Sequence, residues 1–221
     1  MPGTAQATAA PDEDVATELE QSSNRAQARG GLAAGAAFLE RAVLLTPTPI
    51  RRIERLLKAA EVKRDAGALD EALGLLVAVE AGPLDDVRTA ELEHLRGQIA
   101  LEQQRGDAAA RLLRSAGQRL ESLDADTARE THLKSPVAAM WSGDQSSLST
   151  TTAAGLRAPA ARKPERAADL LLDGLALRVT DGYAAAVPAL SRALDLVIAS
   201  GVDPDHADAW LSLNPPMKLV G

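Results

Sequence analysis

The sequence predicts an all-α protein, built as a right-handed α-solenoid of about five helical hairpins. Of its 221 residues, 46% are apolar but only 2% are aromatic, and Ala and Leu make up about a third, which favours close-packed helices over sheets. Glycines recur at positions 30, 67, 106, 143 and 182, with spacings of 37, 39, 37 and 39 residues. A helix-length stretch with apolar residues at helical spacing lies before each glycine, and a second one lies after it.

This pattern divides the chain into five consecutive regions. We expect a disordered N-terminal tail over residues 1–10 and then, over 11–142, repeats 1–3 with the first helix of repeat 4. Residues 143–163 should form a weak or loop-like return segment. Repeat 5 and the start of a sixth helix follow over 164–212, and 213–221 form a second disordered tail.

The second hairpin shows the start and stop signals of its helices most clearly. Thr48 offers an N-cap hydroxyl, and Pro49 takes the first helical position, where its missing N–H costs nothing. Gly67 ends this helix, and Asp70 and Glu71 lie in the first turn of the next, where the helix dipole favours carboxylates. The predicted core of this hairpin is Ile53, Leu56, Leu57, Ala60, Ala72, Leu75, Leu76 and Val79.

The third and fifth hairpins repeat this logic. Asp107 is predicted to cap the return helix of the third hairpin, and Pro164 to start the first helix of the fifth. The predicted apolar positions of the return helix of the fifth hairpin are Ala186, Leu190, Ala193 and Leu194.

Two segments depart from the repeat. Pro136 lies inside the first helix of the fourth hairpin, where proline removes a hydrogen bond, so we expect a kink or a restart there. Residues 145–152 then concentrate Ser and Thr, which compete with the helical backbone. A sixth helix begins at Asp203 and Pro204, and the chain stops soon afterwards, which is typical of a truncated array rather than a capped one.

The fifth hairpin resembles a tetratricopeptide repeat (TPR). Gly174 supplies the small residue of the first helix and Tyr183 the aromatic residue that opens the second, followed by small, large and small residues at Ala186, Leu190 and Ala193. Small residues let two helix axes approach, and the large residue fills the groove between them. The structural positions expected across the repeats are Gly30, Ala42, Ala60, Gly67, Ala72, Gly106, Gly174, Gly182, Tyr183, Ala186 and Ala193.

A longer resemblance covers residues 11–200. The runs Arg25 to Gly31, Phe38 to Ala42, Leu95 to Ala100 and Ala168 to Ala176 are similar to the helical-repeat region of bacterial LuxR-family ATP-binding transcriptional regulators. The resemblance implies an N-terminal P-loop module, this helical middle region and a C-terminal helix-turn-helix that binds DNA. This chain would supply only the middle region.

Composition and motifs exclude several chemistries. There is no cysteine, so disulfides, thiolate metal sites and a Cys nucleophile are excluded. The net charge of −7 argues against a nucleic-acid or anionic-membrane surface. No G-x-x-x-x-G-K-[ST] loop is present, no stretch approaches 18 apolar residues, and no secretory signal opens the chain, so we expect a cytoplasmic protein.

The remaining polar groups each have an ordinary structural interpretation. The cluster of Asp203, Asp205, His206 and Asp208 could hold a metal, but a capped helix N-terminus explains it better. The hydroxyls of residues 146–152 lack a nearby general base, so a solvated loop or a strained helix is favoured over a nucleophile.

Basic and aromatic side chains have two interpretations each. Arg51, Arg52 and Arg55 could form a basic patch, but the intervening Glu54 favours a mixed, solvated face. The two tryptophans at 141 and 210 could anchor a ligand, yet packing within or between repeats is favoured because each has an apolar neighbour.

These observations favour a non-enzymatic scaffold or sensor without a cofactor. By its resemblance the segment would offer a concave groove to a protein partner or a small effector and bias an attached module. The alternative is a stand-alone TPR-like adaptor, and an enzyme is the least favoured class. The open C-terminal repeat suggests self-association, with no direct binding to nucleic acid or membrane.

Overall fold

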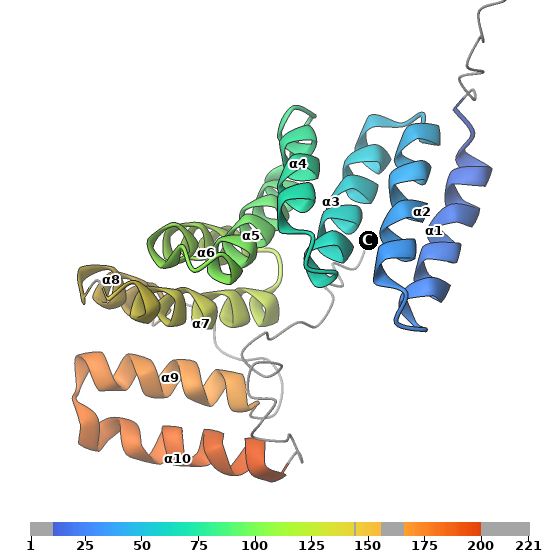
Figure 1. Cartoon of the computed structure of the whole chain (residues 1–221). Helices are drawn as coiled ribbons and strands as arrows, with labels where there is room; N and C mark the ends of the chain where they lie inside the picture. The colour runs from blue at the N-terminus through green and yellow to red at the C-terminus, as the bar shows by residue number, and fades with distance from the viewer. Residues whose placement is uncertain (1–10, 144, 156–165, 200–221) are drawn as a thin grey trace, which may run out of the picture. The chain divides into compact units, whose positions relative to one another are not determined.

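The computed structural model describes residues 11–143, 145–155 and 166–199 (Figure 1). The chain divides into two compact units, Met1–Arg88 (unit 1) and Thr89–Gly221 (unit 2). The boundary between the two units lies within α5 (Asp86–Glu102), a few residues after Gly82 and Pro83. The predicted tails, Pro164 and the sixth helix at Asp203 lie outside the described residues.

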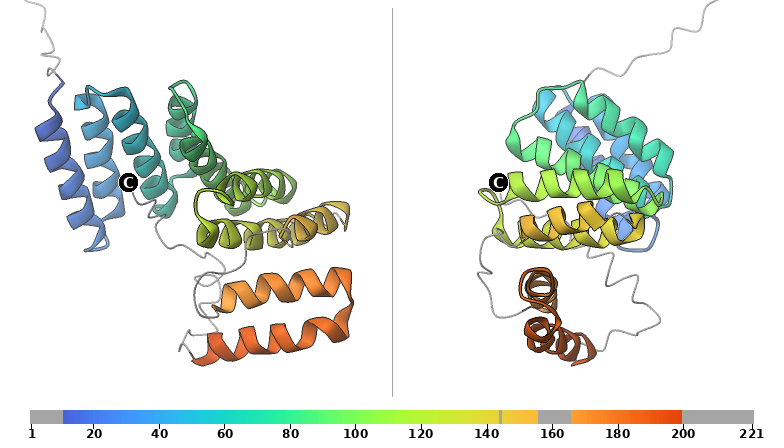
Figure 2. Two further views of the ribbon diagram at one scale, coloured as in Figure 1. Left: turned by 180° about the vertical axis from the view of Figure 1, so that it is seen from behind. Right: turned by 90° about the vertical axis from the view of Figure 1, so that its left-hand side faces the viewer.

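The described residues form ten α-helices and no strand, so the predicted all-α class is confirmed. In chain order they are α1 (Glu13–Gln27), α2 (Leu32–Leu45), α3 (Pro49–Asp65), α4 (Leu69–Glu80), α5 (Asp86–Glu102), α6 (Gly106–Leu120), α7 (Ala125–Ser142), α8 (Gln145–Gly155), α9 (Ala167–Thr180) and α10 (Tyr183–Ala199). Figures 1 and 2 show α1, α2 and α3 packed side by side in chain order within unit 1. No helix in the described ranges is both long and apolar enough to cross a membrane.

Among the described residues, each hairpin turn has one residue with a left-handed backbone. Gly30, Gly67, Gly143 and Gly182 have φ between 73° and 88°, where a glycine has no Cβ to clash. In the third hairpin this residue is Gln104, with φ of 58°.

The turn predicted at Gly106 is therefore wrong. Gly106 is the first residue of α6 and is buried against α7: a Cβ at Gly106 would lie 2.7 Å from the carbonyl oxygen of Ala138. Arg105, not Asp107, is the N-cap of α6, and Asp107 lies in the first turn. A close helix contact thus accounts for a glycine that the repeat spacing had assigned to the turn.

The core of unit 1 consists of alanines facing larger aliphatic side chains. Leu39 packs with Ala36, Ala59 and Val62, and Leu45 packs with Ala16 and Ala42. The predicted core of the second hairpin is buried except Leu75, which is partly buried against Leu39 and its neighbours. Thr48 is the N-cap of α3 and Pro49 its first residue, but the Thr48 hydroxyl makes no capping bond; only its carbonyl accepts, from the Arg52 N–H at 3.0 Å.

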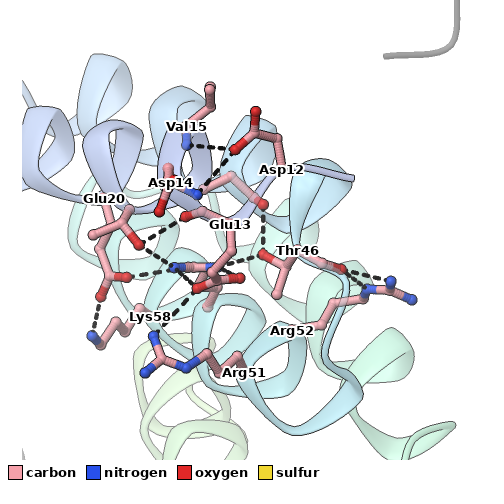
Figure 3. A network of polar contacts seen from close by, with 12 residues as sticks. Asp12, Glu13, Asp14, Val15, Glu20, Thr46, Arg51, Arg52 and Lys58 are labelled. Carbon is pink, nitrogen blue, oxygen red and sulfur yellow. Dashed lines mark hydrogen bonds and ion pairs between the residues drawn. The ribbon is translucent and has the colours of Figure 1, made fainter. Parts of the chain in front are cut away.

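A buried arginine, Arg55, joins α3 to α1 and to the C-cap of α2. Figure 3 shows its partners Glu13, Glu20 and Thr46 gathered in one polar network. The Arg55 side chain is only 2% exposed; its Nη2 donates to Glu13 Oε1 at 2.8 Å, its Nε to Glu20 Oε2 at 3.1 Å and its Nη1 to Thr46 Oγ1 at 2.6 Å. The solvated face predicted for Arg55 is therefore wrong, although Arg51, which also pairs with Glu13, is 59% exposed. Sequence spacing could not reveal the two carboxylate partners, because Glu20 and Glu13 lie 35 and 42 residues away on α1.

Helix α7 continues through Pro136 without a restart. The hydroxyl of the fully buried Ser135 donates to the carbonyl of Ala110 on α6 at 2.8 Å, and Ala138 and Ala139 are buried in the same contact. The predicted restart is wrong because packing on α6 supports the helix where proline removes one backbone bond.

A helix also replaces the loop-like segment predicted around residues 143–163, as far as those residues are described. Within α8, the hydroxyls of Thr150, Thr151 and Thr152 donate to carbonyls four residues earlier at 2.7 to 2.8 Å. Thr151 and Thr152 are also buried, at 3% and 1% exposure. Packing and satisfied hydroxyls therefore outweigh the low helix propensity of threonine.

Candidate functional site

Helix α10 buries a face of small residues against α9. Ala186 and Ala193 are 0% and 3% exposed. On α9, a Cβ added at Gly174 would lie 2.6 Å from Cδ2 of Leu190, so the two helices approach as closely as a glycine allows. Gly174, Ala186 and Ala193, the small residues predicted from the sequence, therefore lie at the contact between α9 and α10.

The side of α10 that adjoins this buried face exposes large apolar side chains. We call Tyr183, Val187, Leu194 and Ile198 the α10 stripe; their exposed fractions are 69%, 38%, 59% and 67%. With 3.6 residues per turn, these four positions fall within about 60° of one another on the helix. Contiguous apolar surface of this kind commonly marks an interaction site in a soluble protein.

Leu194 was expected on the buried side together with Ala193, and that expectation is wrong. Adjacent residues of a helix point about 100° apart, so burial of Ala193 turns Leu194 toward solvent. The intervals within the stripe carried the signal that was missed, since Tyr183, Val187, Leu194 and Ile198 share one side of the helix.

A cation borders one end of the stripe. The guanidinium carbon of Arg178, in the last turn of α9, lies 6.0 Å from the centre of the Tyr183 ring. This distance allows a cation–π attraction, which favours one orientation of the ring. Tyr183 therefore opens α10 as predicted, but as an exposed side chain.

A second exposed apolar pair ends α7. Met140 is 57% exposed and Trp141 is 67% exposed, so the packing predicted for Trp141 is wrong. Ala138 and Ala139 occupy the buried positions of this turn, and the two residues that follow them are exposed. Trp210 lies outside the described residues.

Ion pairs connect α7 with α9 in unit 2. Arg129 Nε donates to Asp169 Oδ1 at 2.7 Å, and its Nη2 donates to Asp173 Oδ1 at 2.7 Å. Arg166 donates to Asp169 and to Glu130. Burial alone would raise the pKa of Asp169, but the bonds from Arg166 and Arg129 outweigh it and hold that pKa below its ordinary value. Every cation of the group has a carboxylate partner, so its role is structural.

The same burial acts on the neighbouring Glu130. Desolvation raises the pKa of Glu130 even though Arg166 and Lys134 oppose the shift. The carboxyls of Glu130 and Asp169 are therefore shifted in opposite directions within one contact between α7 and α9.

The two described histidines, His94 and His132, each make a polar contact with a different residue. His94 Nδ1 is 3.0 Å from the hydroxyl of Thr131, and His132 Nε2 is 2.9 Å from Glu121 Oε1. In the described ranges no three His, Asp or Glu side chains are placed to hold one metal ion. The acidic cluster around His206 lies outside those ranges.

The positions predicted from the repeat pattern occupy three kinds of place. Those fully or almost fully buried between helices are Ala42, Ala60, Ala72, Gly106, Gly174, Ala186 and Ala193. Those in left-handed turns are Gly30, Gly67 and Gly182. Tyr183 alone among them presents a large side chain to solvent, so the candidate interaction surface is the α10 stripe that it begins.

Paired helices with small residues at their contacts and one left-handed residue per turn define a TPR-like helical-repeat protein. Two solved structures, both of MamA, share this fold. One has a TM-score of 0.56 and 18% identity over 81% of this chain and 96% of that chain. The other has a TM-score of 0.55 and 18% identity over 85% of this chain and 94% of that chain. No family model and no curated protein matches the sequence.

Proposed function

We propose that this chain is a non-enzymatic protein-interaction scaffold that associates with a second copy of itself through the α10 stripe. The TPR-like fold supports an interaction role, and the exposed stripe is the observation that carries the proposal. Removing such apolar side chains from water stabilises an interface by roughly 25 cal/mol for each Å² buried.

The arrangement of the stripe favours a second copy as the partner. Its intervals of 4, 7 and 4 residues read the same in both directions along α10. In an antiparallel pair of α10 helices with a two-fold axis beside Leu190, Tyr183 would face Ile198 of the second copy, and Val187 would face Leu194. A symmetric pair requires such a self-complementary surface.

Analytical ultracentrifugation of the chain over a wide range of concentrations tests this association. The wild-type chain should dimerise. Leu194→Glu should stay monomeric, because the new carboxylate would be buried without a partner against Val187 of the second copy. Leu44→Glu is the matched control, since Leu44 is 67% exposed on α2 in unit 1. A monomeric wild-type chain at every concentration would rule out the second copy.

For the biological context, we propose that the chain is the middle region of a LuxR-type regulator. Its support is the sequence resemblance over residues 11–200, with a concave groove for a protein or small effector. A P-loop reading frame directly upstream or a helix-turn-helix directly downstream in the gene would support it. An independent promoter and flanking stop codons would favour the stand-alone adaptor. The cytoplasmic location and the lack of a cofactor stay predictions.

A further inference from the structure

A cleft of about 170 Å³ lies between α6 and α8 in unit 2. Ala110, Arg111 and Arg114 line it from α6, and the hydroxyl residues Ser146, Ser147, Thr150 and Thr151 line it from α8. Ala110 and Thr151 are buried at 1% and 3% exposure and form its base, while Arg111 and Thr150 are exposed, so the cleft opens to solvent.

The two arginines of this cleft differ from three other arginines of unit 2 in their polar partners. Arg119, Arg129 and Arg166 each pair with a carboxylate of another helix. Arg111 and Arg114, one turn apart on α6, have no acidic partner among the residues that the structure describes. On a chain with a net charge of −7, this cleft therefore brings together two positive charges that have no carboxylate partner in the described ranges.

The opposite wall of the cleft offers acceptors. The hydroxyl of Thr150 donates its hydrogen to the carbonyl of Ser146 at 2.8 Å, and that of Thr151 donates to the carbonyl of Ser147 at 2.8 Å. Each oxygen keeps lone pairs, so the exposed Thr150 hydroxyl can accept a bond from a ligand. A fitting ligand carries negative charge toward α6 and N–H donors toward α8.

We propose that this cleft binds an acidic peptide segment of a partner protein. Side-chain carboxylates of the peptide accept charge-assisted hydrogen bonds from Arg111 and Arg114, and a peptide N–H donates to Thr150. Free phosphate would satisfy the arginines but supplies few donors for the hydroxyl wall. The inference rests on the proposed protein-binding function, but it uses a surface separate from the α10 stripe.

Fluorescence anisotropy with a labelled peptide of alternating Glu and Gly tests the inference, with a Gln and Gly peptide as the neutral probe. At about 0.15 M salt, where the Debye length is about 8 Å, long-range steering is largely screened. The wild-type chain should bind the acidic peptide saturably and the neutral one at least about tenfold more weakly. Arg111→Ala with Arg114→Ala should weaken acidic-peptide binding by about tenfold or more, and Thr150→Val by a few-fold.

Arg29→Ala with Arg41→Ala is the matched control. These two arginines are exposed in unit 1 and also have no acidic partner among the described residues. Equal loss in both double variants would mean nonspecific charge attraction and would overturn the inference. The absence of saturable binding of the acidic peptide would also overturn it. So would full displacement of the bound peptide by inorganic phosphate at about millimolar concentration, because phosphate would then bind as tightly as the peptide.

Two measurements separate this inference from the proposed function. Circular dichroism should show unchanged helix content in all variants, and ultracentrifugation should show the same dimer for Arg111→Ala with Arg114→Ala as for the wild-type chain. If the dimer forms and no acidic peptide binds, only the cleft inference fails. If the peptide binds and the chain is monomeric, only the α10 association fails.

Discussion

Gly174 on α9 faces Leu190 on α10 so closely that a Cβ at Gly174 would lie 2.6 Å from Cδ2 and 2.7 Å from Cγ of Leu190. The contact leaves no space for even one methyl group, because protein interiors are close-packed. This pair holds together the two helices that present the α10 stripe. Its tightness can be tested with one substitution.

Gly174→Ala should lower the free energy of unfolding by about 1 to 3 kcal/mol, since Leu190 must move to admit the methyl group. Gly74→Ala is the matched control, because Gly74 lies inside α4 with nothing within 4 Å of its added Cβ. That change should stabilise the chain by about 0.5 to 1 kcal/mol, through helix propensity. Urea denaturation measures both, and the same sign for the two changes would contradict the close contact.

Arg55→Ala should destabilise unit 1 by roughly 1 to 3 kcal/mol, because it leaves Thr46 and two carboxylates without their buried partner. The partners Glu13 and Glu20 are 31% and 21% exposed, so water offsets part of the loss. Arg51→Ala removes a pair to the same Glu13 from a side chain that is 59% exposed, and should cost less than about 1 kcal/mol. Thermal unfolding followed by circular dichroism compares the two; equal costs would mean that burial of Arg55 has no energetic effect.

Acid should weaken the contact between α7 and α9 below about pH 4, the ordinary range of an Asp carboxyl. The pKa of Asp169 is lowered in the folded chain, so its contribution is complete above the unfolded pKa and is lost as pH falls through the folded pKa. Asp169→Asn removes that titration. The decrease in the urea midpoint from pH 6 to pH 3 should therefore be smaller for Asp169→Asn than for the wild-type chain. An equal decrease in both would contradict the role of Asp169.

Mild acid should lower the stability of the chain through His132, at a higher pH than the effect of Asp169. Burial lowers the pKa of His132, although the bond to Glu121 opposes the shift, and Arg129 lowers it further. Below an unfolded pKa of about 6.5, the unfolded chain therefore binds more protons and stability falls with pH. The buried Nδ1 of His132 has no hydrogen-bond partner among the described residues, so a proton there would have no acceptor.

His132→Gln should flatten the decline in stability between pH 7 and pH 5, and differential scanning calorimetry at both pH values measures it. His94→Gln serves as the control, because His94 is buried near Thr131 rather than beside Glu121. An unchanged slope in His132→Gln would show that His132 does not carry this dependence.

The sequence predicted the hairpins because helical repeats are specified locally. Apolar spacing and recurring glycines located both helices of every hairpin except the fourth, whose return helix α8 was expected as a weak or loop-like segment, and small residues such as Ala186 and Gly174 marked the contacts. These signals require only neighbouring residues, since a helix buries one side and a turn needs one permissive backbone. The same reasoning failed at residue 106, where a glycine served packing and Gln104 took the left-handed turn.

The sequence by itself thus determined the all-α class, the repeat period and most buried positions. Tertiary structure alone decided that Arg55 is buried, that Trp141 is exposed and that α7 continues through Pro136. It also brought Arg111 of α6 beside the hydroxyls of α8. The physical reason is that helix formation depends on contacts three or four residues apart, whereas burial of a charge and the lining of a cleft depend on side chains tens of residues away.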